Sequence, residues 1–217
     1  NLTGLAGFSP DDQENLYAGT DAGNASDADT CYNIAIGYKA GYTNAEGDYN
    51  ILLGMCAGYA IDNDADNVFI GRYAGKTTTS AYCSVYIGAM AGCNSCNVGG
   101  NVLIGSNAGK ELCKGNNANT FVGEMAGQCH TCNCRTSNNS GYNSFFGNSA
   151  GKCGNTKYST IIGHSAGLQG WDTEQNVIIG YEAGRKICHD ISNSICPANN
   201  VIIGAQNGPS TKALMAC

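Results

Sequence analysis

The nine-residue stretch Asn-Val-Phe-Ile-Gly-Arg-Tyr-Ala-Gly at residues 67–75 decides the fold, because variants of it recur from one end of the chain to the other. In general form the repeat is Asn, three apolar residues, Gly, two variable residues, Ala and Gly. Most successive copies are 17 or 18 residues apart. A fixed period this short is typical of a protein in which each repeat forms one coil. The eleven copies begin at residues 15, 33, 50, 67, 84, 101, 119, 143, 159, 176 and 200.

The three apolar positions of the repeat are rich in Val, Ile and Phe, which indicates a short β-strand, and no repeat shows helical periodicity. We therefore predict an all-β fold: a single parallel β-solenoid of about eleven coils with a 17–18 residue period. Neighbouring coils would stack about 4.8 Å apart into a rod roughly 50 Å long. The predicted parts are an N-terminal lead-in or cap (residues 1–14), the solenoid (residues 15–208) and a C-terminal tail (residues 209–217).

The Asn that opens the repeat predicts an inward amide ladder. Each Asn side chain would donate a hydrogen bond to the next and satisfy backbone groups at the bend. The alternative is that Asn recurs because it favours turns. The two repeat glycines predict corners that need positive φ or a close backbone approach. The predicted ladder comprises Asn33, Asn50, Asn67, Asn101, Asn119, Asn143, Asn176 and Asn200.

The repeat strand is apolar on both faces, because alternation places its first and third residues on one face and its middle residue on the other. Strands of this kind are normally buried on both faces. We therefore predict that the strand is covered on both sides, with the stripe of middle residues packed against another copy or against the coil's own connecting segment. The stripe comprises Phe69, Tyr86, Leu103, Phe121, Phe145, Ile161, Ile178 and Ile202.

Charge and cysteine content predict the compartment. The chain has 217 residues, with 11 basic and 17 acidic side chains and no basic cluster, so no nucleic-acid partner is expected. Thirteen cysteines predict an extracellular location, secreted or at the cell surface. Sequons at Asn1, Asn24 and Asn138 agree with this location, so glycans are expected. No membrane span is visible, and we interpret Asn1 as the start of a mature secreted chain.

Stacking also predicts disulfides, because residues at equal offset on neighbouring coils lie within the Cα–Cα distance that a disulfide spans. Two pairs of cysteines share such an offset, and a third pair would close an insertion between repeats. The predicted pairs are Cys96 with Cys113, Cys129 with Cys153, and Cys188 with Cys196.

No metal site or cofactor is predicted, although two segments invite comparison with metal sites. The cysteines and histidine between Cys129 and Cys134 have a second interpretation as zinc ligands. Asp62, Asp64 and Asp66 alternate as in a calcium loop, but Asn stands where such a loop needs Gly. A solvated acidic turn is the alternative to a calcium site.

The sequence predicts no enzyme and no catalytic residues. No Ser, His and Asp trio recurs on neighbouring coils at matching offsets, and neither does a pair of carboxylates of the kind that cleaves polysaccharides. The only histidines are His130, His164 and His189.

The repeat Asn-x-x-Ile-Gly-x-x-Ala-Gly, seen at residues 67–75, 101–109 and 176–184, resembles the repeats of bacteriophage tail-fibre shafts. More loosely, it resembles the repeats in the heads of trimeric autotransporter adhesins such as YadA. The resemblance covers residues 15–208. It implies a fibrous, non-enzymatic and often trimeric surface structure.

Together these observations predict an extracellular structural protein, the subunit of a disulfide-stapled, glycosylated fibre or surface filament built by homopolymerisation. The alternative is an adhesin or another surface-binding module. An ice-binding solenoid should show a ladder of Thr at one repeat offset, whereas Thr here is scattered, with residues 77–79 a single local run.

The end of the chain bears on how copies would join. The last repeat follows the consensus and only nine residues follow Gly208, so we expect an open terminal coil that polymerises head to tail, with lateral association as an addition. The odd number of cysteines makes Cys217 a candidate for an intermolecular disulfide. The alternative is that residues 209–217 fold back as an apolar plug, using Leu214 and Met215, with Cys217 paired internally.

Overall fold

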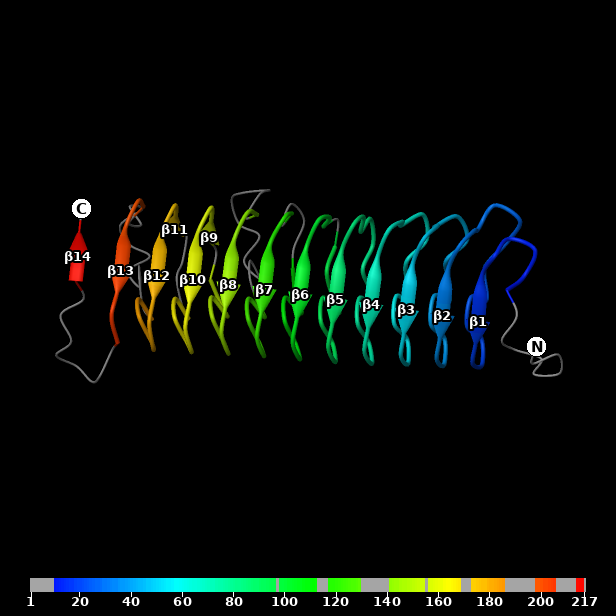
Figure 1. Ribbon diagram of the computed structural model, residues 1–217, viewed down its shortest axis with the longest axis horizontal. Helices are drawn as coiled ribbons and strands as arrows, with labels where there is room; N and C mark the ends of the chain where they lie inside the picture. Colours follow the sequence, from blue (N-terminus) through cyan, green and yellow to red (C-terminus); the bar gives the residue numbers. More distant parts are fainter. Residues whose placement is uncertain are drawn as a thin grey trace.

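The computed structural model describes residues 10–96, 98–112, 117–129, 141–154, 156–168, 173–185, 198–205 and 214–216. These residues form strands and turns but no helix. One three-residue strand from each repeat joins a single parallel sheet, and the strands follow one another in chain order along a rod (Figure 1). The predicted parallel β-solenoid is therefore confirmed.

The eleven parallel strands have the same length and the same place in the repeat. They are β1 (Leu16–Ala18), β2 (Ile34–Ile36), β3 (Ile51–Leu53), β4 (Val68–Ile70), β5 (Val85–Ile87), β6 (Val102–Ile104), β7 (Thr120–Val122), β8 (Ser144–Phe146), β10 (Thr160–Ile162), β12 (Val177–Ile179) and β13 (Val201–Ile203). The remaining strands are β9 (Thr156–Lys157) and β11 (Thr173–Glu174), which pair with each other, and β14 (Leu214–Ala216).

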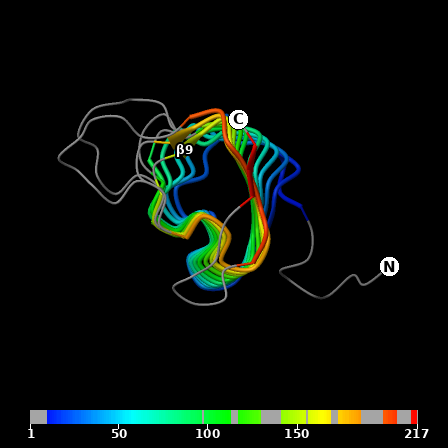
Figure 2. The same ribbon diagram turned by 90° about the vertical axis from the view of Figure 1, so that its left-hand side faces the viewer.

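Equivalent residues of neighbouring repeats pair directly, so the register never slips. Phe69 of β4, for example, lies between Leu52 of β3 and Tyr86 of β5. Seen along the rod, the described coils superpose on one outline (Figure 2). Every inward-facing position of the repeat therefore forms a column that runs the length of the rod.

The core consists of such columns. The middle residue of each strand from β2 to β13 is at most 6% exposed, and the repeat Ala at the corner is equally enclosed. Aromatic rings stack along the middle column, with ring centroids 4.5 Å apart for Phe69 and Tyr86 and 4.4 Å apart for Phe121 and Phe145. Each stack buries large apolar surface that one coil alone could not enclose.

The Asn column forms the predicted amide ladder. The Oδ1 atom of Asn50 accepts the backbone N–H of Asn67 at 3.1 Å, and the Nδ2 group of Asn67 donates back to the same oxygen at 3.1 Å. The Nδ2 group of Asn67 also donates to the carbonyl of Ala81 at 2.8 Å. Where the repeat has Ser84, its Oγ atom accepts the N–H of Asn101 at 3.3 Å. The ladder thus satisfies buried backbone groups that no strand pairing reaches.

The two repeat glycines are needed for different reasons. Gly54 has φ +131°, and a Cβ there would lie 2.7 Å from the carbonyl oxygen of Gly71 in the next coil. Gly75 has φ +57°, and a Cβ there would lie 2.6 Å from the ring of Phe69 in the same coil. The first glycine allows neighbouring corners to stack backbone on backbone, and the second makes room for the large middle side chain.

The C-terminal end differs from the predicted open coil. Strand β14 pairs antiparallel with β13, which places Met215 opposite Ile202 and Leu214 opposite Ile203. The expectation of an open last coil is therefore wrong, because β14 pairs along the edge of β13, while the plug and the internal pairing of Cys217 remain predictions. An antiparallel strand is a simple cap, since it pairs the edge of β13 without continuing the coil. Cys217 lies outside the described residues.

Candidate functional site

The candidate site is the outward face of the parallel sheet. We call it the strand face and define it as the first and third residues of the eleven parallel strands. These positions point away from the coil interior, because the middle residues point into it. The strand face holds no charged residue, and its only hydroxyl side chains are Thr120, Ser144 and Thr160. It is therefore an uncharged apolar strip as long as the rod.

Nothing in the described chain covers the strand face. Ile104 is 36% exposed, Phe146 40% and Ile203 53%, whereas the middle residues Leu103 and Phe145 are fully enclosed. The prediction of cover on both sides is half right. The middle stripe packs inside its own coil, which confirms its burial, but the flanking residues stay open to solvent. The described connecting segments close the coil on the opposite side of the sheet (Figure 2).

Tyrosines line both rims of the strand face. On the rim before the strands, Tyr32 and Tyr49 stack with ring centroids 5.1 Å apart, and Tyr142 and Tyr158 stack at 5.3 Å. All four lie immediately before the first residue of a repeat, which is Asn in three cases and Ser159 in the fourth. All four have positive φ, although this backbone region disfavours large side chains. On the rim after the strands lie Tyr38 and Tyr181. These six rings are about half exposed.

Sequence reasoning missed these rims, although the signal was present. Tyr occupies the position before the first residue of the repeat in four of the eleven repeats. Equivalent residues of neighbouring coils stack in a solenoid, so Tyr at this position predicts stacked aromatic rings along one rim of the sheet. Tyrosine combines a large apolar ring with a polar end, which suits the border between an apolar contact and water.

The interior contains one buried acid. Asp64 is 2% exposed, its Oδ2 atom has no hydrogen-bond partner, and the hydroxyl of Tyr86 is likewise buried without one. Burial raises the pKa of Asp64 to about 6, and the N–H groups of Ala81 and Ser80 only partly offset this. Burial also raises the pKa of Tyr86. The carboxyl group is therefore neutral in acidic solution and becomes an only partly compensated buried charge at neutral pH.

The calcium interpretation of this acidic stretch fails on geometry. Asp64 points into the coil, whereas Asp62 and Asp66 are exposed. Across the residues that the structure describes, no three His, Cys, Asp or Glu side chains gather closely enough to hold a metal ion. The zinc interpretation involves residues 130–134, which lie outside the described part of the chain. Of the histidines only His164 is described, and its ring stacks on Tyr181 at 5.3 Å.

All seven described cysteines are free thiols. Cys129 and Cys153 stand at equivalent positions of neighbouring coils, as predicted. Burial raises the pKa of the Cys153 thiol, and the adjacent thiol of Cys129 raises it further. The two thiols are thus close neighbours, and their disulfide remains a prediction. Cys96 is exposed, and its predicted partner Cys113 lies outside the described residues, as do Cys188 and Cys196.

One of the three sequons can be placed. Asn24 is exposed in a turn, and the hydroxyl of Ser26, two residues later, lies 2.9 Å from that of Tyr17. The position is accessible to a glycosylating enzyme. Asn1 and Asn138 lie outside the described residues.

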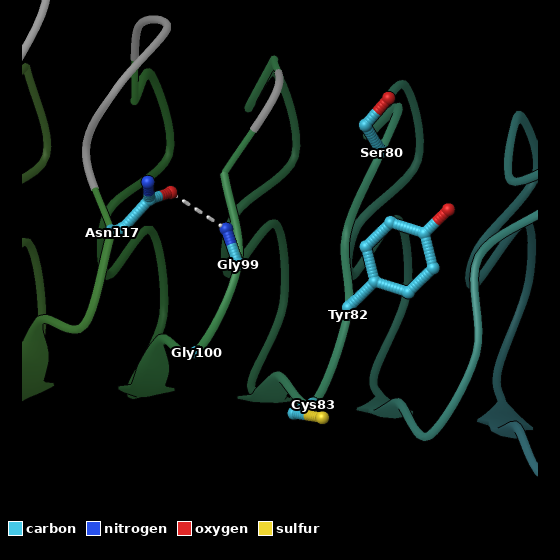
Figure 3. A pocket seen from close by; sticks show the side chains of 6 residues that line it. All are labelled: Ser80, Tyr82, Cys83, Gly99, Gly100 and Asn117. Atoms are coloured by element: carbon cyan, nitrogen blue, oxygen red, sulfur yellow. Dashed lines mark hydrogen bonds between the residues drawn. The ribbon is translucent and has the colours of Figure 1, made fainter.

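A shallow hollow of about 510 Å³ lies on the segments that lead into strands β5–β7 (Figure 3). It exists because Gly99 and Gly100 carry no side chains where the coils on either side carry Tyr82, Cys83 and Asn117. Asn117 lines one end, and its Oδ1 atom accepts the N–H of Gly99 at 2.9 Å. The hollow contains no carboxylate, amine or imidazole, and its reactive groups are the thiol of Cys83 and the hydroxyls of Ser80 and Tyr82.

Comparison of the chain with protein-family models, with curated proteins and with solved structures returns no match. Among the described residues there is also no helix of the length and apolarity needed to cross a membrane. The geometry of the chain itself therefore carries the functional argument.

Proposed function

We propose that the chain is an extracellular structural protein, the subunit of a disulfide-stapled, glycosylated fibre or surface filament that assembles from copies of itself. The observation that carries the proposal is the strand face. Exposed apolar patches of several hundred Å² mark interaction sites on soluble proteins. Here such a patch extends along the whole rod, and no convergent group of titratable side chains competes with it as a functional feature of the described residues.

The proposed extracellular location is supported by residues that can form disulfides or carry a glycan. Thiols at equivalent positions of neighbouring coils, such as Cys129 and Cys153, are placed for staples between coils. The exposed Asn24 offers a site for a glycan.

The capped end changes how such a fibre would grow. A copy that joins at β13 must first displace β14, or must pair with the outer edge of β14 instead. Head-to-tail growth is therefore slower to begin than it would be from an open coil. Association through the sides of the rods has no such barrier, so we propose that it contributes more to assembly than the ends do.

The test is the state of native protein in solution. We expect light scattering to report species far heavier than the 22.4 kDa chain at micromolar concentration under oxidising conditions, and electron microscopy to show elongated particles. Added reductant should shorten the assemblies if intermolecular disulfides contribute. A monodisperse monomer under oxidising conditions would overturn the proposal.

A further inference from the structure

A partner that covers the whole strand face must match its repeat spacing. The side chains of the strand face form two files with one residue about every 4.8 Å over a length of roughly 50 Å. A partner that covers the full length must present ridges with the same spacing, or its side chains drift out of phase with the grooves. A second copy of the chain meets this requirement, because its own strand face has the same period and also lacks cover.

The area suits a stable contact between two copies. Three residues per strand over eleven strands give a flat footprint of about 500 Å², and the tyrosine rims widen it to about 800 Å². A standard protein–protein interface buries about 800 Å² on each partner. The distribution of residue types also matches an interface, with aliphatic side chains at the centre and exposed tyrosines such as Tyr49 and Tyr158 at the border.

The charge of the rod is strongly uneven along its axis, and this decides the orientation. Residues 1–66 hold 11 acidic side chains and one basic side chain, a net charge of −10. Among the described residues from 67 onward, four acidic and six basic side chains give a net charge of +2. Rods side by side in the same direction would place the two −10 segments together. Rods in opposite directions place each acidic segment along the positive part of the partner.

We propose that the strand face is the interface between two copies of the chain that lie side by side and antiparallel. This inference rests on the self-association proposed above and specifies its geometry. Full overlap of the two faces sets β6, the sixth of the eleven strands, opposite β6 of the second copy. The third strand, β3, then lies opposite the ninth, β10, so Ile51 of one copy faces Thr160 of the other. The twofold axis runs along the strands, so the rim of Tyr49 meets the rim of Tyr158.

The first experiment maps the contact. The photo-cross-linking residue benzoylphenylalanine replaces Ile51, which is half-buried, and cross-linked peptides of the oxidised full chain are identified by mass spectrometry. We expect links to residues around Thr160. Links to the third repeat of the second copy would show parallel rods and overturn the antiparallel geometry while leaving self-association intact. Assemblies that form without any link from this position would show that the strand face is not the interface.

The second experiment tests whether the centre of the strand face is buried in the dimer. Ile104→Lys sets two lysines face to face at the centre and should weaken the dimer at least tenfold in sedimentation velocity. The matched control is Asn63→Lys, which adds the same charge at an exposed position away from the strand face and should leave the dimer nearly unchanged. Circular dichroism checks that both variants fold.

Salt gives the orientation independently. For antiparallel rods, raising NaCl from about 0.02 M to about 0.5 M screens an attraction and should raise the dissociation constant several-fold. Parallel rods would respond in the opposite sense, because the same salt screens a repulsion. Equal affinity of the two lysine variants, or tighter binding at high salt, would overturn the proposal.

Discussion

The two faces of the same strand are both apolar in sequence but differ in burial. Leu103 and Ile104 are neighbours of similar size, yet Leu103 is fully enclosed and Ile104 is 36% exposed. The ten parallel strands from β2 to β13 share this contrast, with the middle residue inside and its neighbours outside. The chain itself encloses the middle residues, whereas nothing in the described chain covers their neighbours. An apolar pattern therefore does not by itself show that a residue is buried within one chain.

The largest expected effect tests this contrast directly. Leu103→Ala should lower the free energy of unfolding by about 4 kcal/mol, because it leaves a cavity inside a closed coil. Ile104→Ala should cost only about 1 kcal/mol in dilute solution, because much of its surface is already in water. Urea unfolding at low protein concentration measures both values. Equal losses would show that the outer face is covered within the single chain.

A disulfide between Cys129 and Cys153 should stabilise the folded chain almost as much as the Leu103 side chain does. It would act on the unfolded chain and not through core packing. Oxidation should join Cys129 to Cys153 and raise the free energy of unfolding by about 3 kcal/mol, because the link constrains the unfolded chain. The gain is read from urea unfolding before and after oxidation, and Cys153→Ser should abolish it. Recovery of both residues as free thiols in peptide mapping of oxidised protein would contradict the pairing.

The contrast between inside and outside also applies to acids. Below about pH 4, Asp64 binds a proton in both the folded and the unfolded state. Between about pH 4 and 6 only the folded chain keeps that proton, since its pKa is about 6, so this residue lowers stability as the pH rises. The loss is at most about 3 kcal/mol above pH 6. Asp64→Asn removes this loss. Its free energy of unfolding, relative to that of the wild type, should therefore increase as the pH rises from about 4 to 6.

The matched control for this prediction is Asp62→Asn, two residues away on the outside of the coil. Because Asp62 is exposed, its replacement should leave the pH profile parallel to that of the wild type. The same pH-dependent gain in both variants would mean that the burial of Asp64 is not the cause.

The smallest of the four effects concerns the amide ladder. Asn67→Ala removes the partner of the Ser84 N–H and two donations by the Asn67 side chain, and should cost about 2 kcal/mol. Asn67→Ser should cost about half as much, because Ser84 already shows that a hydroxyl accepts the following N–H. Thermal unfolding ranks the two variants. Asn63→Ala, at an exposed position, should have almost no effect, and a similar loss there would argue against a special role for the ladder.

The repeat alone was sufficient to predict most of the fold. An Asn, three apolar residues and two glycines at constant spacing leave few options besides a stacked coil. The hydrogen bonds that Asn67 donates to Asn50 and Asn119 donates to Asn101 follow the predicted ladder. Local sequence is informative here because every coil packs only on its neighbours, so each position repeats one environment.

The strand face could not be predicted with the same certainty, since both faces of a strand read alike when both are apolar. Which face closes the coil depends on the direction in which the chain turns after Gly71, and that direction is a property of the whole corner. The burial of Asp64 was missed for the same reason. Three acids at alternate positions look equivalent in sequence, and only the path of the connecting segment turns one of them inward.

The sequence by itself therefore determined the period, the strand, the ladder and the corners, because those depend on contacts between equivalent residues of adjacent repeats. Only the tertiary structure decided which apolar face remains open, which acid is buried and how the C-terminal strand caps the last coil. Those features depend on how the closed coil encloses its interior and on where the repeat stops. Neither is encoded in any single repeat.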